Sequence, residues 1–159
     1  MCCEHHADRT HQKYALRAVT DHDDAWLYQL NAATMREYAE QTYGPWDEAA
    51  ARRIFASRWD LSSMRIIVVG GEDAGLLDLR RHPDGLEVAQ IKILPPFQRR
   101  GLGTAILTDI LRDTHQRGQS VILRVLKVNP ARRLYERLGF VVTGETDTHF
   151  LMAARPGIS

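Results

Sequence analysis

Residues 98–104, with the sequence Gln-Arg-Arg-Gly-Leu-Gly-Thr, constrain the fold most strongly, because they join an apolar run at 88–94 to an amphipathic segment that continues to Gln116. A strand that passes through a glycine-containing loop into a helix brings free backbone N–H groups and the positive end of the helix dipole to one point, where phosphate binds. The loop lacks the Gly-Lys-Ser/Thr of a Walker loop and the third glycine of a dinucleotide fingerprint. It therefore predicts a phosphate-bearing ligand other than ATP or NAD.

The two glycines of this loop are its most informative residues. A side chain at Gly101 or Gly103 would keep a diphosphate away from the backbone, and phosphate-binding loops often need a positive φ. Arg99 and Arg100 would add long-range attraction. An ordinary strand-to-helix turn remains an alternative interpretation of the loop taken alone.

The charge of the chain is distributed unevenly. Residues 95–137 hold nine Lys and Arg against three Asp and Glu, which suits a ligand with several phosphates, whereas residues 21–60 hold eight acids against four bases. If residues 21–60 hold the second substrate, their acidity favours a cationic amine. Nucleic acid is disfavoured, because no aromatic residues interleave the basic segment.

Length and composition predict one globular domain at 14–155 after a disordered polar tail at 1–13. The chain has 159 residues, of which 44% are hydrophobic and 26% charged. Because the sequence shows neither a membrane span nor a signal peptide, we expect a cytoplasmic protein without a membrane partner. Cys2, Cys3, His5, His6 and His11 match no structural zinc pattern, so no metal site is expected.

Hydrophobic periodicity predicts a mixed α/β fold. A strand at 14–19 precedes helices at 22–38, capped by Thr20 or Asp21, and at 47–58. Strands at 65–69, 75–80 and 86–94 form an antiparallel meander, because their turns are short. A helix from Leu102 to near Gly118 then leads to a parallel strand at 121–125. A helix from Asn129 to Gly139 and a hairpin of 140–143 and 149–153 complete the chain. The residues predicted to share the buried face of the 102–118 helix are Leu102, Ile106, Leu107, Ile110 and Leu111.

Two blocks resemble the GNAT superfamily of acyl-CoA-dependent N-acetyltransferases. Gln98-x-x-Gly101-x-Gly103, after Ile-Leu-Pro at 93–95, is similar to its pyrophosphate-binding motif, and residues 129–140, which include Leu-Tyr-Glu-Arg-Leu-Gly-Phe, are similar to its Tyr-x-x-Leu-Gly-Phe helix. The resemblance covers roughly 87–140. It implies a mostly antiparallel sheet of about seven strands with one parallel pair splayed around the cofactor, about four flanking helices, and acetyl-CoA as cofactor.

The resemblance also implies roles for individual residues. Tyr135 would be the general acid and the N–H of Ile93 the donor to the acyl oxygen. Glu87 would be the base, although ordered water serves many family members. The expected cofactor-binding residues are Ile93, Gln98, Arg99, Arg100, Gly101, Leu102, Gly103, Thr104, Asn129 and Arg132. Asn129 stands six residues before Tyr135, where family members commonly have Asn seven before it, so it is also interpreted as a helix cap. Lys92 replaces the apolar or small residue often found there.

For the acceptor, the resemblance implies a pocket between the first two helices, with Tyr38, Tyr43 and Trp46 as candidate lining residues. The predicted reaction is direct transfer of an acetyl group to a primary amine of a small molecule in a ternary complex. A peptide or protein amine, and a non-catalytic acyl-CoA-binding sensor, stay open as alternatives. A homodimer is a family expectation.

Strand periodicity places Glu87, Ala89, Ile91 and Ile93 on one face of the predicted strand at 86–94, and Val88, Gln90, Lys92 and Leu94 on the other.

Overall fold

The structure, a computed structural model, describes residues 13–57 and 61–157. The strands are β1 Ala15–Ala18, β2 Met64–Val69, β3 Glu72–His82, β4 Gly85–Ile93, β5 Ser120–Leu126, β6 Val141–Glu145 and β7 His149–Ala154. The α-helices are α2 Asp24–Tyr43, α3 Glu48–Ser57, α4 Leu102–Gln116 and α5 Arg132–Arg137, and the short 3₁₀ helices are η1 Asp21–Asp23, η2 Leu61–Ser63 and η3 Pro95–Phe97.

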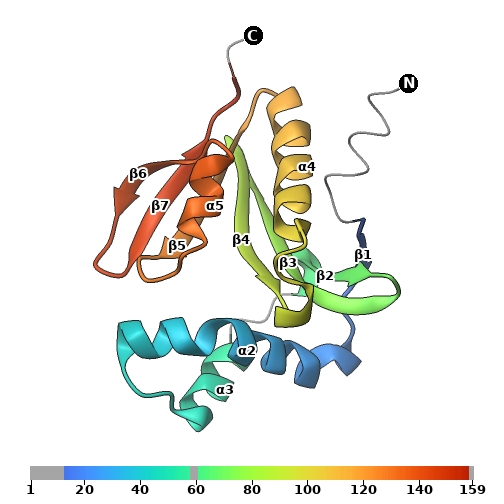
Figure 1. Ribbon diagram of the computed structural model, residues 1–159, viewed down its shortest axis with the longest axis vertical. Helices are drawn as coiled ribbons and strands as arrows, with labels where there is room; N and C mark the ends of the chain where they lie inside the picture. Colours follow the sequence, from blue (N-terminus) through green and yellow to red (C-terminus); the bar gives the residue numbers. More distant parts are fainter. Residues whose placement is uncertain (1–12, 58–60, 158–159) are drawn as a thin grey trace.

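The strands form a single mixed sheet in the order β1-β2-β3-β4-β5-β7-β6 (Figure 1). β1 to β4 pair antiparallel, β4 and β5 pair parallel, and β7 lies antiparallel between β5 and β6. The predicted meander and the parallel pair across the α4 crossover are therefore confirmed. The expected fold class, a seven-stranded, mostly antiparallel sheet flanked by four helices, is the one observed.

Two hydrophobic clusters hold the helices on opposite faces of the sheet. α4 packs through all five residues of its predicted face, each at most 8% exposed, against side chains of β2 to β5 and β7. On the other face, Leu27 and Leu30 of α2 pack against Met64, Ile66 and Leu76. Figure 1 shows α4 running along β4, whereas α2 and α3 lie together at one end of the sheet.

The entry to α2 is fixed by polar contacts rather than by packing alone. Thr20 and Asp23 form a capping box around η1, and Asp23 also binds Arg17, with an N–O distance of 2.9 Å. The hydrogen bond from Arg17 lowers the pKa of Asp23 to about 2. The helix continues five residues beyond the predicted end at Tyr38 and stops where Gly44 adopts a φ of +98°.

The remaining element predictions differ mainly at their ends. Asn129 and Pro130 form a turn before α5 rather than its first residues. The predicted end of the second helix at Arg58 and the Cys and His residues of the N-terminal tail lie outside the described residues. Within the described part of the chain, no helix has the length and hydrophobicity needed to cross a membrane.

Candidate active site

The strands β4 and β5 separate in the middle of the sheet. Their parallel ladder runs only from Gly85 and Ser120 to Val88 and Leu123, although both strands continue beyond these residues. Leu94 donates its N–H to the carbonyl oxygen of Ala74 at 2.8 Å, so alternation along β4 turns the N–H of Ile93 toward the gap beside β5. The expected splayed pair, with a free donor at Ile93, is therefore present in the fold.

The loop that follows β4 presents its backbone at the mouth of this gap. Gln98 donates from Nε2 to the carbonyl oxygen of Ile93 at 2.8 Å, Arg99 has a φ of +63°, and Gly101 has a φ of +76°. Gly101 precedes the first residue of α4 and has no side chain to cap it. The N–H groups of residues 102–104 therefore find no acceptor in the described protein.

The space at Gly103 tests whether this loop fits a diphosphate. A Cβ there would lie 3.5 Å from Leu134 Cδ2 and 3.6 Å from Ile93 Cδ1, both ordinary contacts. Packing within the protein does not demand glycine at this position, so the open backbone is available to a ligand. Three unpaired N–H groups at the start of a 15-residue helix, without a side chain in the way, suit a diphosphate.

The predicted arginines differ in how free they are. Arg99 and Arg100 are exposed beside the loop, and the guanidinium of Arg100 lies 5.5 Å from the ring centre of Phe97. Arg132 instead stacks over Phe150 at 4.3 Å and pairs with Glu136 at 3.3 Å. Arg99 and Arg100 are thus the better placed candidates for a cofactor phosphate.

A cavity of about 1080 Å³ opens from the β4–β5 gap toward α2 and α3. Tyr43 and Trp46 border it, as predicted for the acceptor pocket, whereas Tyr38 is not among its lining residues. Trp46 is held by a hydrogen bond of 2.9 Å from Nε1 to Glu48 Oε2. The predicted cofactor residue Asn129 and the predicted general acid Tyr135 also line this cavity, so cofactor, catalytic and acceptor candidates meet in one space.

Tyr135 combines burial with access to the cavity. The residue is 8% exposed, and its ring makes an edge-to-face contact with Phe140, with the ring centres 5.9 Å apart. Burial raises the pKa of Tyr135 to about 12. Its phenolic oxygen therefore keeps its proton at neutral pH, as a proton donor must.

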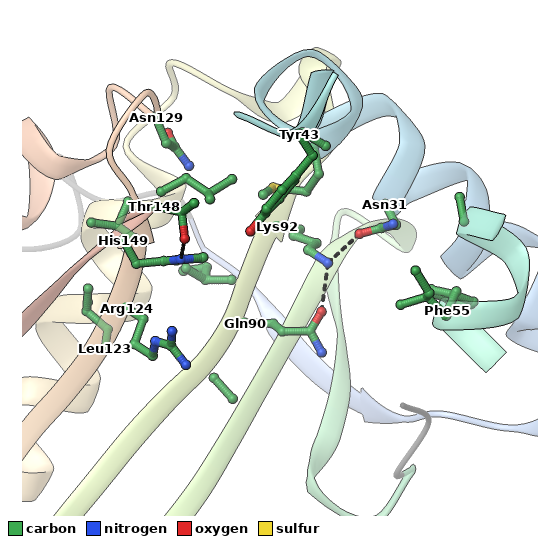
Figure 2. A pocket seen from close by; sticks show the side chains of 18 of the residues that line it. Asn31, Tyr43, Phe55, Gln90, Lys92, Leu123, Arg124, Asn129, Thr148 and His149 are labelled. Atoms are coloured by element: carbon green, nitrogen blue, oxygen red, sulfur yellow. Dashed lines mark hydrogen bonds between the residues drawn. The ribbon is translucent and has the colours of Figure 1, made fainter. Parts of the chain in front are cut away.

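The N-cap of α5 is Ala131, so Asn129 does not cap the helix as weighed from the sequence but holds the turn before it. Its Oδ1 accepts from the N–H of Ala131 at 2.9 Å, which fixes the turn before α5. The amide nitrogen stays at the edge of the cavity (Figure 2). One side chain thereby both orients the helix of Tyr135 and borders the cavity.

The predicted alternation along β4 is wrong beyond Val88. The β3–β4 register passes from Leu79 opposite Val88 to Asp78 opposite Gln90, which makes Ala89 an extra, bulged residue. Leu86 and Val88 therefore share the α4 face with Ile91 and Ile93. Glu87, Gln90 and Lys92 face the cavity together.

Glu87, the predicted base, lies at the wall of this cavity with its side chain 26% exposed. Its Oε1 lies 2.9 Å from Nε2 of His82, at the opposite end of the β3–β4 turn. This contact orients the carboxylate. A carboxylate oxygen can only accept, so Nε2 of His82 is the donor in this contact.

The sequence analysis missed a polar cluster around Lys92. Its Nζ donates to Asn31 Oδ1 of α2 at 2.6 Å and to Gln90 Oε1 at 2.7 Å (Figure 2). Behind Gln90, the fully buried Asp78 accepts from Arg80 and Gln90, both at 3.2 Å. Burial lowers the pKa of Lys92 to about 8, against an opposing attraction from Asp78.

The opposite wall comes from β5 and β7 and was also missed. Arg124, Thr148 and His149 line it, and His149 Nδ1 lies 2.8 Å from Thr148 Oγ1. Burial, and then the charge of Arg124, lowers the pKa of His149. Figure 2 shows Arg124 and His149 pointing across the cavity toward Lys92 and Tyr43. Among the described residues, no group of three or more His, Cys, Asp or Glu side chains could hold a metal ion.

Comparisons with known proteins agree with this geometry. A sequence model of FR47-like proteins matches residues 68–150, just over half of the chain. The PaiA N-acetyltransferase from Thermoplasma acidophilum, solved in complex with coenzyme A, is 15% identical with a TM-score of 0.70, over 91% of this chain and 99% of that one. The ribosomal-protein-S18-alanine N-acetyltransferase from Escherichia coli is 22% identical with a TM-score of 0.64, over 92% of this chain and 96% of that one. Ard1 from Thermoplasma volcanium is 19% identical with a TM-score of 0.59, over 91% and 99%. No curated protein matched the sequence.

These identities establish a common fold, and the family match adds a cofactor. Acetyl-CoA is the cofactor of this family. The residues that would hold it here are the N–H groups of 102–104 for the diphosphate and the β4–β5 gap beside Ile93 for the pantetheine arm. The open space at Gly103 and the unpaired donors fit that ligand. The chain therefore belongs to the FR47-like family of the GNAT superfamily of acetyltransferases.

Proposed function

We propose that this chain transfers an acetyl group from acetyl-CoA to a primary amine of a small molecule, directly within a ternary complex. The observation that carries the proposal is the cavity of about 1080 Å³ that joins the β4–β5 gap to α2 and α3 and contains Tyr135. This cavity is lined by the phenol of Tyr135 and has room for an acceptor, and the free main-chain donor of Ile93 follows directly after the lining residue Lys92 on β4.

Acetyl-CoA supplies the acetyl group as an activated thioester. Tyr135 holds a proton at its phenolic oxygen and delivers it to the departing sulfur. The N–H of Ile93 donates to the acyl oxygen. An alkyl amine is mostly protonated at neutral pH, so the acceptor must lose a proton, and Glu87, backed by His82, takes it directly or through water.

The small size of the acceptor is argued from the cavity wall. Tyr43 and Trp46 border the cavity at the junction of α2 and α3. Of the eight acids within residues 21–60, Asp47 alone is a described lining residue. An acidic groove for a basic peptide would instead need several of these acids along its floor.

The test is acyl transfer from isotopically labelled acetyl-CoA to a pooled panel of amines and peptides, read by mass spectrometry. We expect a small amine to be labelled by the wild type, and Tyr135→Phe to be much slower although it binds the cofactor equally well. Labelling confined to peptides would replace the small-molecule acceptor by a peptide. Cofactor binding without any labelled product would favour an acyl-CoA sensor, which has no use for Tyr135.

A further inference from the structure

The acceptor cavity contains positive charge that the protein does not neutralise. Lys92 Nζ contacts the neutral amide oxygens of Asn31 and Gln90, and within the described residues no carboxylate lies within 4.0 Å of it. The nearby Asp78 is already bound by Arg80 at 3.2 Å. An ammonium has three N–H donors, so one donor of Lys92 is left for the cavity.

A second cation faces the same space from the other wall. Arg124 is an exposed residue of β5 and makes no ion pair with any residue that the structure describes. Its charge reaches the cavity, since it lowers the pKa of the neighbouring His149. Figure 2 shows Arg124 on the β5 side of the cavity, and Lys92 across β4 from it, directed toward Asn31 and Gln90.

The acids of the cavity wall, in contrast, already have partners. Asp47 accepts from the N–H of Ala50 at 3.1 Å in the first turn of α3, and Glu87 contacts His82 at 2.9 Å. The third lining cation, Arg80, is neutralised by Asp78. The phosphates of the cofactor belong at the α4 loop, outside this cavity. Lys92 and Arg124 therefore form no direct ion pair with the carboxylates of the cavity wall that the structure describes.

We propose, on the basis of the proposed function, that the acceptor is an amine that also carries a carboxylate, and that Lys92 and Arg124 bind this carboxylate from opposite walls of the cavity. A buried ammonium without a carboxylate in direct contact is unfavourable, and a bound carboxylate supplies the missing acceptor for its third N–H. The cationic acceptor expected from the acid count of residues 21–60 is thereby revised to an amino acid-like one.

The protonation state of Lys92 supports binding rather than nucleophilic attack by Lys92 itself. With a pKa of about 8, the side chain is mostly an ammonium at neutral pH. The groups that face it are Asn31 from α2, Gln90 from β4, and the pair Asp78 and Arg80 from β3. A bound carboxylate would add a negative neighbour and stabilise the ammonium further.

The experiment compares acceptors that share a carbon skeleton: an α-amino acid, its carboxamide, the corresponding amine without the acid, and the aminoalkyl phosphonate. For the wild type we expect kcat/KM to be highest for the carboxylate. Lys92→Met and Arg124→Gln should each lower kcat/KM for the carboxylate about 10- to 100-fold, mainly through KM, and leave the carboxamide unaffected. Arg117→Gln, an exposed cation beyond α4, is the matched control and should keep the wild-type preference.

A ligand-binding experiment tests the carboxylate site independently of the proposed acetyl transfer. Butanoate, which has no amine, should raise the thermal midpoint of the wild type but not of Lys92→Met, whereas butanamide should affect neither. If no amine is labelled but butanoate still binds through Lys92, the transfer activity is refuted and the anion site stands. Equal rates for acid and carboxamide, a preference for the phosphonate, or acetylation of Lys92 itself in the intact mass would each overturn the carboxylate site.

Discussion

Replacing Lys92 by methionine should change how the free energy of unfolding depends on pH. Methionine has a similar length and no charge, so it fills the same space beside Asn31 and Gln90 without a titrating group. The pKa of Lys92 is about 8 in the folded protein, against 10.5 for an unperturbed lysine, because burial disfavours the charged form. The charged groups that face it are Asp78 and Arg80 of β3, which both proteins retain.

The sign and size of this pH dependence follow from the linkage between proton binding and unfolding. Below pH 8 the lysine is protonated in both states, and its burial costs stability. As the pH rises toward 10.5, the folded state loses this proton first, so the unfolded state binds more protons and stability increases with pH. A shift of one pKa unit corresponds to about 1.4 kcal/mol. Between about pH 7 and 9.5, the free energy of unfolding of the wild type should therefore rise by about 2 kcal/mol relative to that of Lys92→Met.

Urea unfolding at several pH values across this range measures the difference directly. The pKa of Tyr14 and that of Tyr135 are both raised in the folded state, and their small contributions cancel because both proteins contain them. Arg117→Gln serves as a control and should run parallel to the wild type. If Lys92→Met also runs parallel to the wild type at every pH, Lys92 is solvated in solution and the reasoning from its burial fails.

Three further outcomes are expected. Tyr135→Phe should lower kcat about 10²- to 10³-fold with an unchanged acetyl-CoA Kd, and full activity would remove Tyr135 from catalysis. Gly103→Ala should raise the acetyl-CoA Kd at least about tenfold, because the added methyl group would lie between the backbone and the diphosphate. The free energy of unfolding should stay equal or rise, because the new Cβ meets only ordinary contacts. An unchanged Kd would contradict the phosphate site at α4. Arg17→Met should lower the free energy of unfolding by about 2 kcal/mol at pH 7. In urea unfolding, this difference from the wild type should fade between about pH 4 and 2, because Asp23 becomes protonated in the wild type. A difference that does not change with pH would show that the Arg17–Asp23 pair does not stabilise the fold.

Much of the fold could be predicted because local patterns mark it. The buried face of α4, from Leu102 to Leu111, follows helical spacing, and the β3–β4 turn is marked by Pro, Asp and Gly between two apolar runs. Residues 98–104 alone left an ordinary strand-to-helix turn open, and the phosphate-binding interpretation depended on the second block at 129–140. α2 runs past Tyr38, because nothing local stops a helix there, and ends at Gly44, where Gly-Pro at 44–45 breaks the helical pattern.

The polar half of the acceptor cavity could not be predicted, because its partners are distant in the sequence. Asn31 contacts Lys92 across 61 residues, and Arg124 and His149 become neighbours only through the pairing of β5 with β7. The acid count of residues 21–60 likewise does not describe the cavity wall. Asp23 binds Arg17, Glu40 binds Arg36 and Glu48 binds Arg52, so these carboxylates are neutralised away from the cavity.

A single inserted residue decides which side chains reach the cavity. Without the bulge at Ala89, strict alternation would carry Gln90 and Lys92 to the face under α4 and turn Ile91 and Ile93 toward α2. With it, the two isoleucines complete the core beneath α4, and Glu87 is joined on the other face by Gln90 and Lys92. The bulge lies where the ladder to β5 ends at Val88, so the backbone opening and the polar wall arise at the same point of β4. The gap between β4 and β5 and the polar wall of the cavity are thus set together by the local backbone of one strand.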